Sequence, residues 1–209
     1  MCNLYRMTKG TAEVANLFNV EGDLAANYGA EVYPGYPGLV VAEGRARAMT
    51  WGFPLMLKGK QGQPLKPKPV TNAREDKLDT AFWRDSFARR RCLIPVSQWA
   101  EPRGNAGRMT RSWYGWPDHE LFAVAGLWRM NAEWGAVYTM VMTESSEYMS
   151  DVHDRMPVIL TPDQWPQWTD GGFEQAMALC RTWPEPLTAD HTNGRWVDGV
   201  LMPEQPGLL

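Results

Sequence analysis

Two neighbouring stretches decide the fold: LFAVAGLWR at residues 121–129 and AVYTMVMT at residues 136–143. Both are rich in β-branched and aromatic residues, and a short polar turn around residues 131–135 separates them. This pattern predicts two long antiparallel strands. The run RCLIPV at residues 91–96 is short and apolar, which is typical of a buried strand. These three segments form the expected core of a sheet.

The segments around this core are expected to be a mixture of short strands and short helices. Strands are expected at residues 39–43, 45–53 and 156–160, and helices at residues 11–20, 80–90 and from Thr161 onward. Thr11 and Thr161 are expected to cap two of these helices. One or two helical turns are expected between residues 144 and 153, and exposed polar loops at residues 58–69 and 102–118.

Strands therefore dominate, and helices interrupt them at irregular intervals. No regular alternation of strand and helix indicates a parallel doubly wound sheet. We expect an α+β fold in which a curled, mostly antiparallel sheet forms the core. The length of 209 residues is consistent with a single domain over residues 1–209.

Composition limits the classes of function. The formal net charge is −3, so bulk charge does not favour nucleic-acid binding, although a basic groove can lie on an acidic protein. Clusters of Lys between residues 58 and 68 and of Arg between residues 84 and 111 are either such a groove or ordinary solvated surface. The three cysteines, Cys2, Cys92 and Cys180, form no CxxC pair, which predicts neither a disulfide framework nor a metal site. With no signal peptide and no apolar run of membrane-spanning length, we expect a cytoplasmic monomer without a cofactor.

Cys2 stands directly behind the initiator methionine, a position in which it has unusual chemistry. If Met1 is removed, Cys2 carries a free α-amine and a thiol on adjacent carbons. An aldehyde then forms an imine with the amine, and the sulfur closes on the imine carbon to give a five-membered thiazolidine. An internal cysteine cannot do this, because its nitrogen is an amide. The alternative is an incidental second residue in a frayed terminus.

Two further stretches carry candidate polar groups. In VTNARE, at residues 70–75, Asn72 and Arg74 are spaced to present an amide and a guanidinium to an anionic ligand, although Asn is also common in turns. In QWAEPRG, at residues 98–104, Glu101 follows an apolar strand. Partial burial there raises the pKa of a carboxyl group toward the range useful for acid–base catalysis; an ordinary surface glutamate is the alternative.

The stretch SDVHDRMPVIL, at residues 150–160, places His153 just before a strong strand. Its neighbours Asp154 and Arg155 bring a carboxylate and a guanidinium to the imidazole, and Asp154 can fix its tautomer. A structural histidine is an equal alternative. A Cys–His–Asp set also suggests a cysteine protease, but no spacing here requires one.

In this order the stretches MC, NARE, RCLIP with W-x-E, FAVAGLW and HDRMPVIL resemble the SOS response-associated peptidase (SRAP) family. The resemblance is clearest over residues 1–160, whereas residues 161–209 are divergent. It implies a barrel-like antiparallel sheet. It also implies a protein that senses abasic sites in single-stranded DNA and crosslinks itself to them, with lyase-like chemistry and a thiol-dependent autoprocessing peptidase activity. Its DNA-bound fraction would lie with the nucleoid.

The resemblance also implies roles for four catalytic residues. Cys2 matches the crosslinking cysteine, and Asn72 matches the asparagine that anchors and orients the N-terminus. Glu101 matches the acidic residue tied to amine chemistry and N-terminal processing. His153 matches the histidine that handles protons on the opened sugar.

Four further positions match DNA-contacting residues of the family. Arg74 and Arg155 match arginines that contact phosphates. Thr143, at a strand end before the histidine loop, and Pro34, in the YPG turn, are looser matches. No metal ligand is implied.

This chain departs from the family pattern at several points. The usual Cys-Gly-Arg start is Cys2-Asn3-Leu4, so a phosphate-binding arginine is missing there, and Arg6 is a candidate substitute. Glu31 replaces the usual Asn before the turn and places an acid near the expected DNA path. In relatives, certain side chains separate base pairs. The candidates for this role here are Trp51, Met56 and Leu57.

Two other readings are compatible with the sequence. One is an N-terminal-nucleophile hydrolase, in which the Cys2 thiol attacks a peptide or amide and its own amine is the base. The other is a non-catalytic module whose basic loops bind single-stranded DNA without regard to a lesion, with strong salt dependence.

Overall fold

A computed structural model describes residues 2–23 and 25–196. The state of Met1 and the final residues, 197–209, lie outside the described residues. No helix within the described ranges has the length and apolar character needed to cross a membrane.

The core of the molecule is a barrel-like sheet built around the two expected central strands. These are β12 (Phe122–Asn131) and β13 (Gly135–Glu144), which pair antiparallel. The order continues through β9 (Arg91–Val96), β4 (Pro37–Ala42) and β5 (Arg45–Trp51), each antiparallel to its neighbour. A parallel pairing of β5 with β13, which places Thr50 opposite Val137, joins the two ends of this order. The expected curled, mostly antiparallel α+β fold is confirmed.

Short strands extend the barrel where the polar candidates lie. β8 (Asn72–Arg74) runs parallel to β13, and β14 (Arg155–Pro157) pairs antiparallel with the same strand. β15 (Ile159–Leu160) pairs with β12, and β2 (Glu21–Gly22) pairs with β5. The last part of β13 is therefore flanked by the NAR and HDR stretches, which are distant in sequence.

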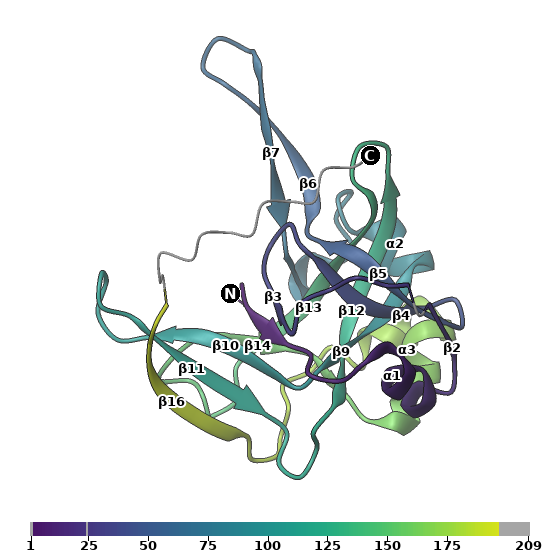
Figure 1. Cartoon of the computed structure of the whole chain (residues 1–209). Coiled ribbons are helices and arrows are strands. Elements are labelled where there is room, and N and C mark those ends of the chain that lie inside the picture. The colour runs from purple at the N-terminus through teal and green to yellow at the C-terminus, as the bar shows by residue number, and fades with distance from the viewer. Residues whose placement is uncertain (1, 24, 197–209) are drawn as a thin grey trace.

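A second sheet packs beside the barrel, with the order β16, β11, β10, β1, β3 (Figure 1). Its strands are β1 (Tyr5–Arg6), β3 (Glu31–Val32), β10 (Gln98–Arg103), β11 (Thr110–Gly115) and β16 (Thr188–Arg195). The expectation of a loop over residues 102–118 is therefore wrong at its centre. Trp113 and Tyr114 lie in β11 and are buried, because the strand alternates its side chains between two packed faces.

The two sheets are joined through a buried pair of tyrosines. The hydroxyl groups of Tyr5 in β1 and Tyr138 in β13 share a hydrogen bond of 2.5 Å. Gly38 in β4 leaves the space for them, because a Cβ atom at this position would collide with both hydroxyl oxygens. The N-terminal strand is thereby fixed to the barrel three residues after Cys2.

Residues 58–69 are mostly exposed, as expected, but only residues 59–63 form a turn and the others belong to strands. β6 (Phe53–Lys58) and β7 (Pro64–Val70) form a separate two-stranded hairpin that extends away from the rest of the molecule (Figure 1). The prolines of β7 lack an N–H donor, and a strand with only one partner tolerates this loss.

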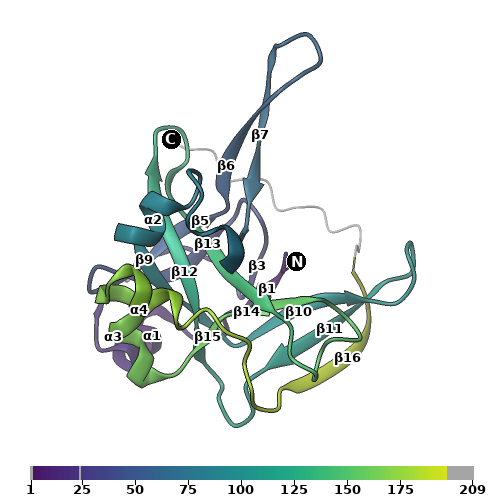
Figure 2. The ribbon, with the colours of Figure 1, turned by 180° about the vertical axis from the view of Figure 1, so that it is seen from behind.

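The helices lie mainly on one side of the barrel, where α1, α3 and α4 are neighbours (Figure 2). The helices are α1 (Thr11–Phe18), α2 (Arg84–Arg89), α3 (Trp165–Asp170) and α4 (Phe173–Met177), with 3-10 turns η1 (Glu75–Lys77) and η2 (Pro162–Gln164). One or two helical turns were expected at residues 144–153, and the structure has turns there but no helix. Thr11 is the first residue of α1 and is buried, so Gly10 is the residue at the N-cap, and its N–H donates to Glu13.

Candidate functional site

Cys2 lies where the N-terminal segment meets both sheets. β1 is held between β10 and β3, and the Leu4 carbonyl accepts the N–H of Ala100 at 2.9 Å. The Cys2 thiol donates to the Leu4 carbonyl at 3.4 Å, and its side chain is fully buried. Cys2 and the residues directly after it are therefore held by backbone pairing and are not frayed.

Asn72 lies against the Cys2 main chain. Its Nδ2 donates to the Cys2 carbonyl at 2.8 Å and to Thr71 Oγ1 at 2.8 Å. β8 holds this side chain in position because it pairs with β13, with Asn72 opposite Met140. The contact joins two residues that are 70 positions apart in the sequence.

The surroundings of Cys2 favour its neutral thiol. Burial raises the pKa of Cys2 strongly, and the negative charge of Glu101 raises it further. A thiolate is thus disfavoured in this environment, although it is the nucleophilic form of cysteine. A reaction in which another group attacks first and the sulfur reacts second suits this environment better than direct attack by a thiolate.

Glu101 is a buried acid in β10, with no exposed surface. Burial raises its pKa to about 7, and the charge of Asp154 acts in the same direction. The electrostatic effects of Glu101 on Cys2 and of Asp154 on Glu101 indicate that the N-terminal segment, β10 and the histidine loop converge here. A carboxyl group with this pKa can both donate and accept a proton near neutral pH.

His153 lies in the turn before β14, partly buried. Its Nδ1 accepts the backbone N–H of Arg155 at 2.9 Å, and Asp154 Oδ1 lies 3.1 Å from the same nitrogen. Because Nδ1 is the acceptor of an N–H, the neutral ring carries its proton on Nε2. Burial lowers the pKa of His153, which favours this neutral form.

Both predicted phosphate-contacting arginines are paired with acids in this structure. Arg74 donates through Nε and Nη2 to the two carboxylate oxygens of Asp76, each at 2.9 Å. Arg155 Nη1 donates to Glu75 at 2.8 and 3.1 Å. A phosphate would therefore have to displace these carboxylates or share the arginines with them. The run Arg74-Glu75-Asp76 already shows in the sequence that two acids follow Arg74.

Thr143 and Pro34, the two looser matches, lie in different parts of the fold. Thr143 is buried in β13 opposite Met156, next to the β13–β14 pairing that carries Arg155. Pro34 lies in the turn between β3 and β4, where the Gly35 N–H donates to the Trp51 carbonyl at 2.7 Å.

The negative charge of Glu31, which replaces the Asn usual in the family, is balanced by its neighbours. Arg6 donates to Glu31 through Nε and Nη2 at 3.1 and 3.0 Å, and the Tyr33 hydroxyl donates at 2.8 Å. Burial opposes ionisation of Glu31, but the bonds from Tyr33 and Arg6 outweigh it and lower its pKa. Arg6 also stacks on Trp113, so it is held within the protein and is not a free substitute for the missing arginine.

One candidate for separating base pairs is wrong. Trp51 is fully buried, and its Nε1 donates to the Thr71 carbonyl at 3.1 Å. Met56 and Leu57 are exposed on the β6–β7 hairpin and stay predictions.

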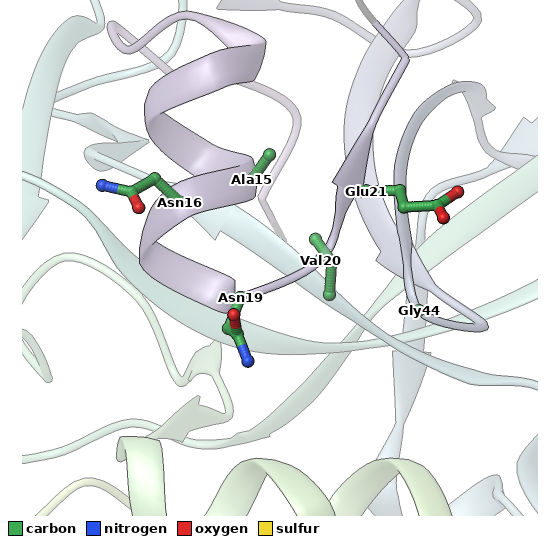
Figure 3. Close-up of a pocket in the computed structure, with 6 residues that line it drawn as sticks. All are labelled: Ala15, Asn16, Asn19, Val20, Glu21 and Gly44. Atoms are coloured by element: carbon green, nitrogen blue, oxygen red, sulfur yellow. The ribbon is translucent and has the colours of Figure 1, made fainter.

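One concave region contains none of the predicted site residues. A pocket beside α1 and β2 is lined by Ala15, Asn16, Asn19, Val20, Glu21 and Gly44 (Figure 3). Among the described residues, no group of three or more His, Cys, Asp or Glu side chains is arranged to hold a metal ion.

Comparisons with known proteins agree on the family. The family model described as SOS response associated peptidase (SRAP) matches residues 1–197. The chain is 27% identical over 202 residues to the abasic site processing protein YobE of Bacillus subtilis, covering 86% of this chain and 89% of that protein. It is 25% identical over 224 residues to the abasic site processing protein YoqW of the same organism, covering 96% and 94%.

Solved structures share the fold. A crystal structure of a protein from Bordetella bronchiseptica has a TM-score of 0.76 at 22% identity, covering 91% of this chain and 99% of that one. A protein from Bacteroides thetaiotaomicron gives 0.75 at 16% identity, covering 91% of both chains.

Proposed function

The chain belongs to the SOS response-associated peptidase family, and from this premise we propose that it captures abasic sites in single-stranded DNA as a thiazolidine on Cys2. The family and its relatives' names support abasic-site processing as the activity. The observation that carries the finer proposal is the contact of Asn72 with the Cys2 carbonyl beside the buried Glu101. An amide and a buried carboxyl group next to Cys2 support its use as an adjacent amine and thiol once Met1 is removed.

Removal of Met1 has two consequences in this scheme. It liberates the α-amine of Cys2, whose pKa of ~8 in unperturbed chains leaves a useful neutral fraction at physiological pH. It also takes away the residue bonded to the Cys2 nitrogen, next to a thiol that is otherwise fully buried.

The reaction proceeds in balanced steps. As the sugar ring opens, its anomeric hydroxyl group loses a proton and its ring oxygen gains one, while the Nε2–H of His153 donates a hydrogen bond to that oxygen. The neutral amine of Cys2 then attacks the aldehyde carbon, and a proton moves from the nitrogen to the oxygen to give a carbinolamine. The resulting hydroxyl group leaves as water with a proton from Glu101, which forms an iminium ion. The Cys2 thiol then adds to the iminium carbon and returns its proton to the Glu101 carboxylate. The product is a neutral thiazolidine, with one water released and the catalytic groups in their starting state.

The high pKa of the thiol favours this order over the hydrolase reading. A hydrolase needs the sulfur to attack first, whereas here the amine attacks first and the sulfur closes the ring. The family's peptidase name remains compatible with processing of its own N-terminus.

Incubation of the processed wild-type protein with single-stranded DNA containing one abasic site tests the proposal. We expect a one-to-one adduct that survives heating in denaturant, and no adduct with undamaged DNA of the same sequence. Equal retention of damaged and undamaged DNA would instead indicate the non-catalytic binding module. Intact mass of the protein before the reaction establishes that Met1 is absent.

The β6–β7 hairpin is proposed to bind the DNA backbone. It carries four exposed lysines (Lys58, Lys60, Lys66 and Lys68), and residues 53–70 contain no Asp or Glu. Exposed apolar side chains accompany them, including Met56, and bases unstacked in single strands can pack on such groups.

Replacing Lys66 and Lys68 by Gln together is expected to weaken binding of single-stranded DNA and reduce its salt dependence. Each lost phosphate contact lowers the slope of log K against log salt by about 0.7, so the double variant loses about 1.4. Fluorescence anisotropy across a salt series measures this slope. Lys9→Gln is the matched control, because Lys9 is paired with Glu120 at 2.7 Å and is not part of the hairpin. An unchanged slope in the double variant excludes the hairpin from the DNA interface.

A further inference from the structure

Thr71 and Asn3 complete a hydrogen-bond chain that ends on Cys2. Asn72 Nδ2 donates to the Cys2 carbonyl and to Thr71 Oγ1, each at 2.8 Å. The Thr71 hydroxyl donates in turn to Asn3 Oδ1 at 3.2 Å. Since Asn3 is covalently bonded to Cys2, the chain closes on itself around the N-terminal peptide.

The chemistry of the acceptors fixes the direction of every bond in this chain. The Cys2 carbonyl can only accept, so it must face the Nδ2 group of Asn72 and not Oδ1. The second N–H of that amide donates to Thr71 Oγ1, which leaves the single Thr71 hydroxyl proton for Asn3. Among the described residues, Asn72 Oδ1 has no hydrogen-bond partner although it is buried, so the Nδ2 contacts alone hold the amide's rotation.

Thr71 is held rigidly by the barrel. Its carbonyl accepts the N–H of Met140 in β13 at 3.0 Å and Trp51 Nε1 at 3.1 Å. Thr71 is itself buried, and Trp51 is fully buried. The hydroxyl group therefore starts from a fixed main chain, whereas the exposed Asn3 side chain is held by the bond it accepts.

We propose that Thr71 and Asn3 are positioning residues for the capture reaction, and that they lock the Asn72 amide so that it holds the Cys2 main chain in the attacking orientation. This inference rests on the proposed function. Neither residue touches the reacting carbon; both act through Asn72. Orientation errors of this kind slow a reaction without weakening DNA binding, because the reacting groups must meet at a defined distance and angle.

Thr71→Val and Thr71→Ser form a matched pair that tests the role of the hydroxyl group. Val has nearly the same shape as Thr but no hydroxyl, whereas Ser keeps the hydroxyl and loses a methyl group. At saturating abasic DNA we expect about tenfold slower adduct formation for Thr71→Val and near-normal rates for Thr71→Ser. The Kd for DNA carrying a tetrahydrofuran abasic analogue, which has no aldehyde, is expected to stay unchanged in both.

Asn3 supplies a second, independent arm. Asn3→Ala removes the acceptor and is expected to slow adduct formation severalfold, whereas Asn3→Asp keeps an acceptor oxygen and restores most of the rate. Asn3 is exposed, so its truncation leaves the core intact and the test does not depend on the stability of the Thr71 variants. Intact mass is measured for each variant so that only protein without Met1 is compared.

The outcomes separate the two proposals. A wild-type protein that forms no adduct overturns the proposed function, and with it the positioning role. A wild type that reacts while Thr71→Val reacts equally fast overturns the positioning role alone. Equal slowing in Thr71→Val and Thr71→Ser, or a change in Kd without a change in maximal rate, also contradicts it, because packing or binding would then explain the effect.

Discussion

A Cys2→Ser protein freed of Met1 is expected to form no adduct with abasic single-stranded DNA that survives denaturation. The serine variant keeps the α-amine and can still form an imine, which water reverses. Only the sulfur supplies the second bond to the same carbon, and its closure is favoured because the two groups are held on adjacent carbons. The yield of heat-stable adduct on a denaturing gel is expected to fall at least ~100-fold.

Borohydride provides the complementary measurement for the same variant. Reduction converts the transient imine into a stable amine, so Cys2→Ser is expected to regain a crosslink only when borohydride is present. Cys180→Ser is the matched control, because Cys180 is also a free cysteine with a raised pKa but lies outside the site. Heat-stable adduct formation by Cys2→Ser at the wild-type level without reduction contradicts the thiazolidine.

Glu101→Gln is expected to slow adduct formation about 100-fold near neutral pH. The carboxyl group supplies the proton with which water leaves and then accepts the thiol proton, and an amide can do neither. Loss of a general acid or base of this kind typically costs 10²–10⁴-fold. The reaction needs both the acid form of Glu101, whose pKa is about 7, and the neutral amine of Cys2, whose unperturbed pKa is ~8, so the wild-type rate is expected to be highest between these values and to fall on either side. A stopped-time assay across pH 5–9 measures both effects.

The same substitution is expected to stabilise the fold at alkaline pH. Burial raises the pKa of Glu101 from 4.5 to about 7, so between these values the folded state retains a proton that the unfolded state has released. Raising the pH across this window therefore lowers the free energy of unfolding, by about 3 kcal/mol at ~1.4 kcal/mol per pKa unit. Glu101→Gln removes this loss, because its side chain stays neutral at every pH.

Denaturant unfolding at pH 5 and pH 8 checks this linkage. The gap in stability between Glu101→Gln and wild type is expected to grow by a few kcal/mol from pH 5 to pH 8. Glu133→Gln, on an exposed turn, is the control and should show no such change. A pH-independent gap means that Glu101 is not a buried acid of raised pKa.

The sequence predicted the barrel's central strands because their signal is local. Residues 121–129 and 136–143 are long, apolar and joined by a short turn, so composition alone identifies a hairpin. Closure of the barrel was not predictable in this way, since β5 pairs with β13 across more than eighty residues. The resemblance supplied the barrel-like shape, and the structure supplies the pairing that produces it.

The wrong secondary-structure predictions concern segments whose composition is not typical of the structure they form. Residues 64–69, PLKPKP, were predicted to be part of a loop because of their prolines, yet an edge strand needs few N–H donors. β11 was not predicted because it lies in a stretch dominated by Gly and Arg, although Trp113 and Tyr114 in its centre are core residues.

The candidate site was likewise predictable only in part from the sequence. Motifs named Cys2, Asn72, Glu101 and His153, but nothing in a motif gives the partners of a side chain. The salt bridges of Arg74 and Arg155, the neutralised Glu31 and the Thr71–Asn3 chain all depend on contacts between distant segments. Their roles in DNA binding and catalysis stay predictions.

Mass spectrometry of the N-terminal peptide after reaction with an abasic oligonucleotide tests the central claim most directly. After nuclease and trypsin digestion, the account predicts a peptide of residues 2–6 that lacks Met1 and carries the sugar remnant, lighter by one water than the sum of its parts. Fragmentation should place the modification on Cys2, with both its nitrogen and its sulfur blocked. A remnant on any lysine, on another cysteine, or on a peptide that retains Met1 contradicts the account.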